Sequence, residues 1–561
     1  MRWEALAEPK YDRVAKLQQE LGVSFVVAAI LVQRGLTDFE TAKNFFRPNW
    51  TALHDPFLMK DMDKAVARIL QAIKQKERIM VYGDYDVDGT TSVALVTSYL
   101  QQITEKVIPY IPDRYAEGYG ISYQGIDKAK EEKIGLIIAL DCGIKAIDKV
   151  AYANELGIDF IICDHHLPEV NIPAAIAVLD PKQPDCSYPF DELCGCGIGF
   201  KLIQALHEKR GNEQEELRSY LDLVATAIAA DIVPMVGENR TLCFYGLKQL
   251  REAPRLGINA FIEQLKKPVN VTDLVFKVAP RINAAGRMDH ALTATRLLLS
   301  QSKDEVKEIA EAIELFNTER RATDERITKE ALKQIEERGE ENSLSTVVFD
   351  DHWHKGVLGI VASRLTETYY RPTVVLTRSD ENYVGSVRSV KGFNVYRALE
   401  DCASHMLQFG GHKYAAGLTL KTTELQPFKT AFEAAVSNRI LPEQKEPVQQ
   451  YDLAIDINAV DHKLYRIIDQ MAPFGPKNMR PVFMSKDCLD SGGTRVVGKE
   501  NDHLRLSIAT EKGVLNGIGF GLAHHYEAIH AGTPFEMLYS LDENEWNGEV
   551  SLQLRIKDIK T

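Results

Sequence analysis

The chain has 561 residues, which is too long for one hydrophobic core and enough for two to four domains. Hydrophobic residues make up 45% of it and charged residues 26%, so a disordered or fibrous chain is excluded and an ordinary soluble globular protein is expected. The net charge of −13 argues against a polyanionic partner. This argument fails if the acids hold cations or if the basic residues gather on one face.

Apolar content and cysteine usage predict a cytoplasmic protein with no membrane contact. No apolar run reaches the roughly 18 residues that span a bilayer, and the start, Met1 to Ala5, lacks the apolar stretch of a signal peptide. The eight cysteines are sparse and irregularly spaced, which favours reduced thiols over disulfides. Cys194 and Cys196 form a close pair without a second pair to complete a zinc site, so we expect them to pack in the core.

The first half of the chain changes from a helical pattern to an alternating one. Apolar residues recur at helical spacing from Val14 to Leu31, and we expect a small helical cap over residues 1–50. From Ile79 onward, strand-like apolar runs alternate with helical segments. The expected strands are 79–82, 107–111, 136–140, 158–163 and 175–179, and the expected helices include 90–100, 122–132, 145–156, 199–209 and 215–230. This alternation predicts an α/β domain over residues 51–300, with a parallel sheet between two layers of helices.

The second half divides into three further regions. Residues 304–338 are rich in Glu, Lys, Arg and Ala and contain no Gly or Pro, which predicts a long, partly exposed helix that connects two domains over residues 301–342. Strand-like segments from Ser345 onward predict a second α/β domain over residues 343–442. Short alternating segments separated by turn residues then predict a small β-barrel or sandwich over residues 443–561.

Acidic residues follow four of the strands in the first α/β domain, at the point where each strand should end. The clearest example is the buried run from Phe160 to Cys163, which leads directly into Asp164-His165-His166. The other strand ends carry Asp84, Asp86 and Asp88, then Asp141, and then Asp180. One aspartate in such a place usually caps the next helix. Several carboxylates at the same sheet edge repel one another unless cations lie between them, so we expect metal ions in this crevice.

The types of ligand narrow the choice of metal and of reaction. Carboxylates mixed with imidazoles suit Mn²⁺ or Mg²⁺, whereas a structural zinc site would need thiolates. Enough carboxylates for a bridge imply two ions about 3.5 to 4 Å apart, which activate water and stabilise in-line displacement at phosphorus. The sequence therefore predicts two divalent ions and hydrolysis of a phosphoester or phosphoanhydride.

In their order along the chain, these motifs resemble those of the DHH phosphoesterase family. The Asp164-His165-His166 triplet lies behind an apolar strand, and the acidic segment from Gly83 to Gly89 is similar to that of the branch formed by single-strand-specific DNA exonucleases. Further matches are Ile111 to Arg114, Asp141 to Gly143, Ala229 to Pro234, Ala279 to Arg287 and Gly410 to Gly417. The resemblance covers nearly the whole chain. It implies a parallel-sheet DHH domain, a second α/β domain that binds substrate, and a C-terminal OB-like β-barrel that binds nucleic acid.

The resemblance also implies a catalytic set in which two divalent ions are held by carboxylates and one imidazole. The implied ligands are Asp141, which would bridge the ions, His165, Asp231, and two of Asp84, Asp86 and Asp88, a choice that stays open. Asp164 and His166 would lie beside the ions, with His166 reaching the phosphate. Since metal ions would activate the water, no Ser or Cys nucleophile is required.

Basic residues supply the expected contacts to the substrate. Guanidinium groups suit a terminal phosphate because they donate two parallel hydrogen bonds. The resemblance implies that Arg114, Arg281 and Arg287 capture a 5′ phosphate, which would impose 5′ to 3′ polarity. In the second domain, glycines let the backbone approach a phosphate while neighbouring side chains donate to it. The residues expected there are Ser386, Arg388, Gly411, His412 and Lys413, and the barrel adds Arg495, Lys499, His503 and Arg505.

The prediction is a single-stranded-DNA-specific 5′ to 3′ exonuclease that releases 5′-mononucleotides and acts in DNA repair and recombination. Its expected partners are single-stranded DNA with a 5′ end, a single-strand-binding protein and a helicase. A nanoRNase or cyclic-dinucleotide phosphodiesterase of the same superfamily would not need the cap, the connecting helix and the barrel. A family II pyrophosphatase is far shorter and lacks a barrel. A catalytically dead scaffold that binds nucleic acid is disfavoured because every motif acid and both histidines are present.

Overall fold

A parallel sheet of five strands forms the centre of the first lobe. In the computed structural model, which describes residues 1–546 and 548–561, these strands are β2 (Arg78–Gly83), β3 (Val107–Tyr110), β4 (Ile134–Leu140), β5 (Asp159–Cys163) and β6 (Ala177–Leu179). Their order is β3-β2-β4-β5-β6, and every neighbouring pair is parallel. Since β3 and β4 lie on opposite sides of β2, the strand order reverses between β2 and β4. A ligand crevice is expected at the carboxyl ends of the strands beside such a reversal.

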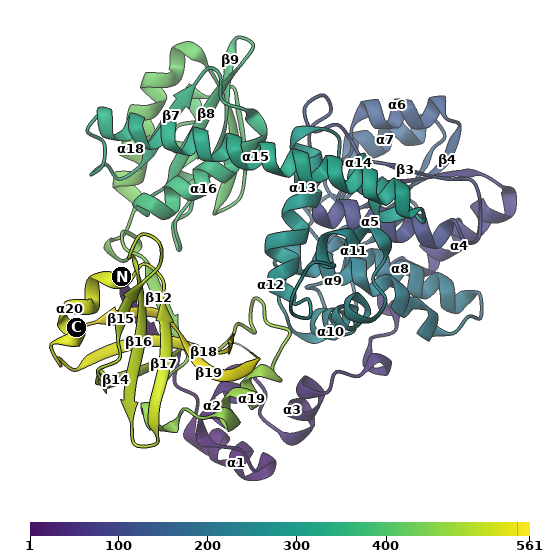
Figure 1. Cartoon of the computed structure of the whole chain (residues 1–561). Helices are drawn as coiled ribbons and strands as arrows, with labels where there is room; N and C mark the ends of the chain where they lie inside the picture. Colours follow the sequence, from purple (N-terminus) through teal and green to yellow (C-terminus); the bar gives the residue numbers. More distant parts are fainter. Residues whose placement is uncertain (547) are drawn as a thin grey trace.

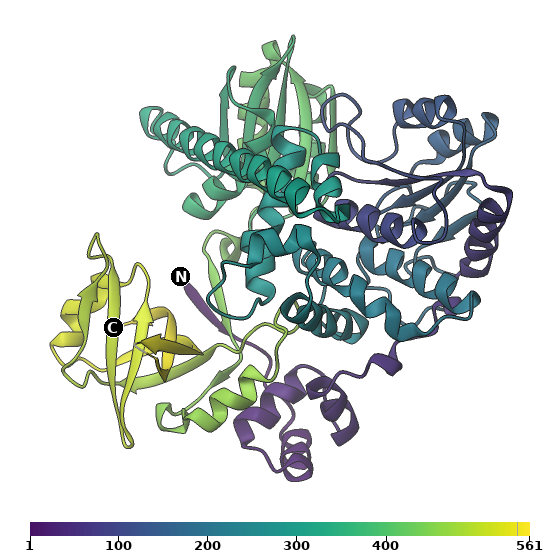
Figure 2. The ribbon, with the colours of Figure 1, turned by 45° about the vertical axis from the view of Figure 1, so that its right-hand side comes forward.

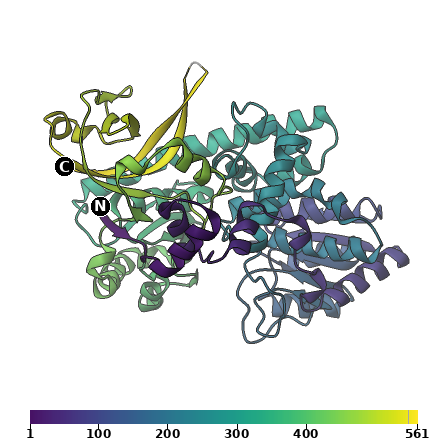
Figure 3. The ribbon, with the colours of Figure 1, turned by 90° about the horizontal axis from the view of Figure 1, so that it is seen from below.

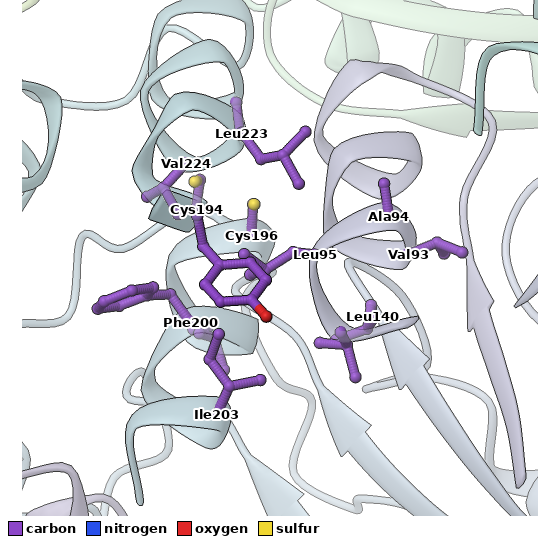
Figure 4. Close-up of a cluster of buried hydrophobic side chains, with 14 of the residues drawn as sticks. Val93, Ala94, Leu95, Leu140, Cys194, Cys196, Phe200, Ile203, Leu223 and Val224 are labelled. Atoms are coloured by element: carbon purple, nitrogen blue, oxygen red, sulfur yellow. The ribbon is translucent and has the colours of Figure 1, made fainter. Parts of the chain in front are cut away.

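Helices cover both faces of this sheet, because successive strand residues point to opposite sides and both sides are apolar. Ile138 belongs to the core beneath α5 (Val87–Leu100), α8 (Gly195–Lys209) and α9 (Leu221–Ala230). Its neighbour Ile137 belongs to the opposite core, beneath α6 (Tyr123–Glu131) and α7 (Ile147–Glu155). Figure 4 shows part of the first core, where Cys194 and Cys196 pack among apolar side chains as predicted. The predicted alternation of strands and helices is therefore confirmed.

The remaining helices of this lobe add side chains to the first of these cores. They are α4 (Met62–Gln75), α10 (Gly237–Glu252), α11 (Leu256–Ile262), α12 (Val271–Asp273), α13 (Ala279–Met288) and α14 (Leu292–Leu299), with a π-helical turn at Leu274–Val278. The connecting helix α15 (Lys303–Glu337) has 35 residues. Its first half buries Val306 and Ile313 in the first lobe, and its second half buries Ile327 and Ile335 in the second. It therefore belongs to both hydrophobic cores, and Figure 2 shows it running between the two lobes.

The second lobe is a smaller α/β domain. Its five-stranded sheet has the order β10-β11-β9-β8-β7, and only the β7–β8 pair is parallel. The strands are β7 (Thr346–Asp350), β8 (Thr373–Ser379), β9 (Asn382–Arg388), β10 (Gln408–Gly411) and β11 (Ala415–Lys421). The helices are α16 (Leu358–Tyr369), α17 (Val395–Asp401) and α18 (Leu425–Arg439).

The third lobe is built on one seven-stranded sheet in the order β13-β14-β18-β19-β17-β16-β15. The strands are β13 (Leu453–Ala454), β14 (Phe483–Cys488), β15 (Arg495–Val497), β16 (His503–Thr510), β17 (Gly513–Gly519), β18 (Phe535–Trp546) and β19 (Glu549–Lys560), with helices α19 (His462–Asp469) and α20 (Tyr526–His530). We expected short strands throughout, but β18 and β19 have 12 residues each and form a long hairpin. Figure 1 shows this lobe apart from the parallel sheet of the first.

The N-terminal segment packs against the C-terminal lobe. Strand β1 (Arg2–Ala5) pairs in parallel with β12 (Val448–Tyr451), and the Trp3 Nε1 donates to Asp558 at 2.8 Å. Helices α1 (Tyr11–Leu21), α2 (Phe25–Gln33) and α3 (Phe39–Phe46) contribute Leu17, Ile30 and other side chains to the core of the seven-stranded sheet. Figure 3 shows these helices beside that lobe. The sequence indicated an apolar helix face, but it could not indicate that a segment more than 400 residues away covers this face.

A helix that crosses a bilayer must be both long and apolar. No single helix in the described part of the chain meets both conditions. Helices α1 and α2 pass that test only as a pair, and they are bent by 118° relative to each other.

Candidate active site

The acidic residues predicted from the sequence meet at the reversal point of the parallel sheet. Asp84 follows β2, Asp141 follows β4, and the Asp164 to His166 triplet follows β5. Asp231 comes from a different element, the C-terminal end of α9. The fold therefore brings together side chains that lie up to 147 positions apart in the sequence (Asp84 to Asp231).

Three overlapping groups of side chains have ligand atoms within 4.8 Å of one another. They are Asp84, Asp86 and Asp141; Asp88, His165 and Asp231; and Asp141, His165 and His166. The Nε2 of His165 lies 3.1 Å from the Asp141 Oδ1, 3.7 Å from the Asp231 Oδ2 and 3.9 Å from the Asp88 Oδ2. The structure thus brings together all six predicted metal ligands. Asp141 belongs to two of the groups, which is the arrangement that a bridging carboxylate requires.

The carboxylates in this cluster lack the partners that buried charges need. Both oxygens of Asp84 and the Oδ1 of Asp141 are buried without a hydrogen-bond partner. Burial, followed by repulsion from neighbouring carboxylates, raises the pKa of Asp84 and of Asp141 well above the ordinary value. Such groups are stable as anions only beside a compensating positive charge. A pair of divalent cations fits this donor set, since it consists of hard carboxylate oxygens with one or two imidazoles.

Asp141 is held in an unusual backbone conformation. Its φ is +59°, in the left-handed region that residues other than glycine rarely adopt. Gly195 packs directly against it, since a Cβ on Gly195 would lie 2.6 Å from the Asp141 Cβ. Strained backbone of this kind persists where the surrounding structure enforces it, commonly at functional sites. Here the strain aims the Asp141 carboxylate into the centre of the cluster.

Helix termini support two carboxylates of the first motif. Asp86 is the N-cap of α5 and accepts the Gly89 N–H at 3.0 Å. Asp88 accepts the N–H groups of Gly195 at 2.6 Å and Cys196 at 2.8 Å, at the positive N-terminus of α8. Burial nevertheless raises the pKa of Asp88 to about 7. All three carboxylates of the motif line the cluster, so the choice of two direct ligands stays open.

The two histidine rings lie in different surroundings. Asp164 accepts the N–H groups of Ile144 at 2.9 Å and His165 at 2.8 Å, and the His166 Nδ1 donates to it at 2.7 Å. Burial opposes ionisation of Asp164, but the hydrogen bonds to its carboxylate and the charge of His166 together outweigh this effect and lower the pKa of Asp164. Burial also lowers the pKa of His165 to about 3, which leaves a neutral imidazole that can bind metal at neutral pH. The Nε2 of His166 lies 3.4 Å from the hydroxyl of Tyr119.

Three of the predicted arginines gather beside the acids, between the first and second lobes. The Arg114 guanidinium lies over the ring of Tyr85 at 4.7 Å, next to Asp84. The Arg287 Nη1 donates to the Gly356 carbonyl of the second lobe at 2.8 Å. Burial, and then repulsion from neighbouring arginines that include Arg114 and Arg388, lowers the pKa of Arg287 to about 10. An anionic group would relieve this repulsion, so the cluster is suited to a phosphate.

The second lobe contributes a strand end to the same region, and a hairpin adjoins this strand end. The Arg388 Nη1 donates to the Ser386 hydroxyl at 2.9 Å. Arg388 pairs across the sheet with Ala415, at the base of the hairpin that carries His412 and Lys413. Gly411 has a φ of +145°, and a Cβ there would lie 2.4 Å from the Ala415 carbonyl, so this hairpin requires glycine.

Arg281 does not lie with the other predicted substrate residues. Its Nε contacts the Glu314 carboxylate at 2.5 Å, its Nη1 donates to the Lys277 carbonyl, and its guanidinium lies over Phe261. It therefore lines a groove of about 770 Å³ between α11 and α15. Arg281 and Arg287 lie on different faces of α13, which the motif alone did not reveal.

The structure also adds side chains that sequence reasoning missed. Tyr85 and Tyr119 flank the acids and contact each other edge to face, with ring centroids 6.0 Å apart. The Lys182 ammonium donates to the His165 carbonyl. Little in the sequence indicated Tyr85, Tyr119 and Lys182. Each lies one or two positions beyond a glycine or an acid that already marked a turn. Asp180 is buried nearby but belongs to none of the three ligand groups.

Together, the parallel sheet and the acid and histidine cluster at its reversal point define a DHH phosphoesterase. The family model for the DHH family, N-terminal domain, matches residues 78–228, that for the DHHA1 domain matches residues 341–438, and that for the RecJ OB domain matches residues 451–558. Relatives called single-stranded-DNA-specific exonuclease RecJ include one from Bacillus subtilis, 38% identical over 100% of this chain and 70% of the relative. Another, from Escherichia coli, is 32% identical over 89% of this chain and 90% of the relative. The chain therefore belongs to the RecJ family.

Solved structures support the same assignment. The crystal structure of RecJ in complex with Mn²⁺ from Thermus thermophilus is 26% identical to this chain, with a TM-score of 0.86, and covers 100% of this chain and 79% of that one. A structure of exonuclease RecJ bound to manganese is 31% identical with a TM-score of 0.62, and covers 69% of this chain and 97% of that one. The predicted fold class, with its DHH, DHHA1 and OB domains, is confirmed by these matches.

Proposed function

We propose that this protein is a metal-dependent exonuclease that degrades single-stranded DNA from the 5′ end, releases 5′-mononucleotides and serves DNA repair and recombination. The observation that carries the proposal is the convergence of Asp84, Asp141, His165 and Asp231, drawn from distant elements, beside a cluster of arginines. The names of the relatives in the RecJ family supply the substrate class. The domain division given above stays a prediction.

The acids and His165 would hold two divalent ions, Mn²⁺ or Mg²⁺. When bound, such ions activate water and neutralise charge that develops on a phosphate. The residues of the chain supply the rest of the site. Asp164 fixes the ring of His166 through the Nδ1 bond at 2.7 Å. Burial opposes protonation of His166, but Asp164 and the neighbouring acids outweigh it and raise the pKa, so the protonated ring can donate from Nε2 to the substrate phosphate. His165, neutral because of its burial, offers its Nε2 lone pair to an ion.

The 5′ polarity would come from the arginines between the lobes. Arg114 and Arg287 approach from the first lobe and Arg388 from the second, so a phosphate between them would be held from two sides. A terminal phosphate carries more charge than an internal diester and exposes more oxygens to guanidinium groups. The hairpin with Gly411, His412 and Lys413 would hold the following backbone phosphates. Arg281, which pairs with Glu314, has no such role in this proposal.

The third lobe would hold the trailing single strand. Arg505 lies in register with Arg495 on one side and Ile518 on the other, and Ile518 is in register with Arg555. The row therefore places three guanidinium groups across four strands. The exposed ring of Phe520 borders this row: its centroid lies 4.9 Å from that of the His503 ring and 5.8 Å from the Arg555 guanidinium. Cations with exposed aromatic rings are the features by which OB folds hold single strands.

We further propose that a single-strand-binding protein and a helicase deliver the substrate, since each exposes or protects single strands. A cytoplasmic setting is supported by the cysteines, all eight of which are free thiols.

The proposal is tested with three substrates: a 5′-phosphorylated single strand, the matching duplex and a dinucleotide, each with Mn²⁺ and with EDTA. We expect cleavage of the single strand from its 5′ end, with mononucleotide products, and none with EDTA. Preference for the dinucleotide would instead support a nanoRNase or cyclic-dinucleotide phosphodiesterase. Tight binding without cleavage, equal in EDTA, would support a scaffold.

A further inference from the structure

We propose that Glu117 is a positioning residue for substrate binding, through the loop of residues 112–121. This inference rests on the proposed function, because it concerns how that site is held open for a strand. The loop joins β3 to α6 and runs over the carboxyl edge of the parallel sheet, beside the acid cluster. Neither the predicted metal ligands nor the predicted phosphate ligands include Glu117.

Three side chains of this loop contact the proposed machinery. The Arg114 guanidinium lies over Tyr85. The Tyr119 hydroxyl lies 3.4 Å from the Nε2 of His166. The Tyr115 hydroxyl donates to the Arg287 carbonyl at 2.6 Å, and it touches the second lobe, since a Cβ on Gly356 would lie 2.6 Å from it. The position of this loop therefore determines where Arg114 can bind a phosphate, where Tyr119 lies beside the catalytic histidine, and whether Tyr115 contacts the second lobe.

Residues 113–119 of the loop have little apolar support, since none of them is buried. Tyr115 and Tyr119 are 48% and 54% exposed. Gly118 and Gly120 have φ values of +86° and +74°, so the chain turns twice through the left-handed region within three residues. Exposed segments with few buried apolar contacts open at low free energy unless hydrogen bonds hold them. A specific anchor is therefore needed to keep Arg114 and Tyr119 in place.

The Glu117 carboxylate is that anchor. It accepts the Tyr110 hydroxyl at 3.0 and 2.9 Å from the end of β3, and the Asp113 N–H at 2.8 Å from the start of the loop. It also accepts the hydroxyl of Ser122, the N-cap of α6. One side chain thus ties the strand before the loop to the helix after it. Removing it would leave three donors without their acceptor, and such losses release a segment rather than unfold a domain.

The anchor lies apart from the metal ligands, which makes the inference separable from the metal chemistry. The carboxylate bonds to Tyr110, Asp113 and Ser122, none of which belongs to the three ligand groups. We therefore expect Glu117→Ala to weaken the hold on a strand while leaving the Kd for Mn²⁺ within twofold of the wild type.

The decisive experiment is a double-mutant cycle with Arg114→Ala, read as the Kd of a 5′-phosphorylated oligothymidylate with Ca²⁺ in place of Mn²⁺. Glu117→Ala should raise this Kd at least tenfold in the wild-type background and less than twofold in the Arg114→Ala background. Glu117→Gln, which keeps one acceptor oxygen, should fall between Glu117→Ala and the wild type. Glu155→Ala, which removes an exposed glutamate from α7, is the matched control and should change nothing.

Hydrogen exchange tests the anchor without any substrate. The Asp113 amide and its neighbours up to residue 119 should exchange at least tenfold faster in Glu117→Ala, while the parallel sheet keeps its protection. The inference is overturned if exchange of this loop is unchanged, or if Glu117→Ala raises the Kd by the same factor in both backgrounds. A wild-type enzyme that binds the strand but cleaves nothing would refute the proposed function and leave the result on the loop standing. One that binds no strand would overturn both.

Discussion

Replacing Asp141 by Asn removes the charge at the centre of the acid cluster while keeping its shape. Asn is a suitable replacement because it tolerates the left-handed backbone, φ +59°, better than Ala does. Asp141 belongs to two of the three ligand groups, so its loss weakens the hold on both ions at once. Metal ions contribute several kcal/mol to the transition state in such sites. A loss of about 4 kcal/mol corresponds to about a thousandfold reduction in rate.

In the absence of metal, Asp141→Asn should instead make the fold more stable. Burial and repulsion from Asp88 and Asp86 raise the pKa of Asp141, so its charge opposes folding when no cation is present. We therefore expect a higher Tm for Asp141→Asn than for the wild type in EDTA, and a smaller gain in Tm when Mn²⁺ is added.

The assay is release of mononucleotides from a 5′-labelled single strand, combined with thermal melts in EDTA and in Mn²⁺. Asp148→Asn, an exposed aspartate in the first turn of α7, is the matched control and should behave as the wild type does. If Asp141→Asn retained more than a tenth of the activity, or melted lower in EDTA, the assignment of Asp141 as a shared ligand would be refuted.

Four further predictions concern the charged residues of the first two lobes. Burial raises the pKa of Asp88 to about 7 and that of Asp231 to about 8, so Mn²⁺ must displace protons to bind. Calorimetry should therefore show tighter Mn²⁺ binding as the pH rises through this range. A Kd that does not change with pH would contradict this prediction. The metal-free Tm should fall over the same rise, because the folded state keeps protons that the unfolded state has released. Arg388→Lys would lose a bidentate contact with the terminal phosphate that is worth about 1.5 kcal/mol. KM should therefore rise about tenfold for a 5′-phosphorylated strand and stay within twofold for a 5′-hydroxyl strand. Equal effects on both strands would exclude a contact between Arg388 and the terminal phosphate. Arg281→Ala should keep kcat/KM within twofold of the wild type, since Arg281 pairs with Glu314. A tenfold loss would show that Arg281 does contact the substrate.

The sequence was sufficient to predict the parallel sheet and most of the acid cluster. The reason is local: a buried strand is an apolar run, and Asp84, Asp141 and Asp164 each come directly after one. Parallel strands end at one edge, so such residues converge whatever the details of packing. Asp231 was different, because it ends a helix, and only the resemblance to the DHH family pointed to it.

Features that depend on packing between distant segments were not predictable in this way. The apolar face of α2 was visible in the sequence, but its partner, the core of the seven-stranded sheet, was not. Arg281 and Arg287 share one motif, yet α13 turns them toward different surroundings. The anchor at Glu117 left no pattern either, because its donors Tyr110, Asp113 and Ser122 are an ordinary mixture of turn and strand residues.

The claim on which the mechanism depends is that the carboxylates and His165 hold two cations. It is tested most directly by diffraction from Mn²⁺-soaked crystals, with anomalous maps calculated at the manganese edge. We predict two strong peaks among Asp84, Asp86, Asp88, Asp141, His165 and Asp231, both absent from crystals of Asp141→Asn. Peaks elsewhere, or a cluster that remains empty at millimolar Mn²⁺, would contradict the account.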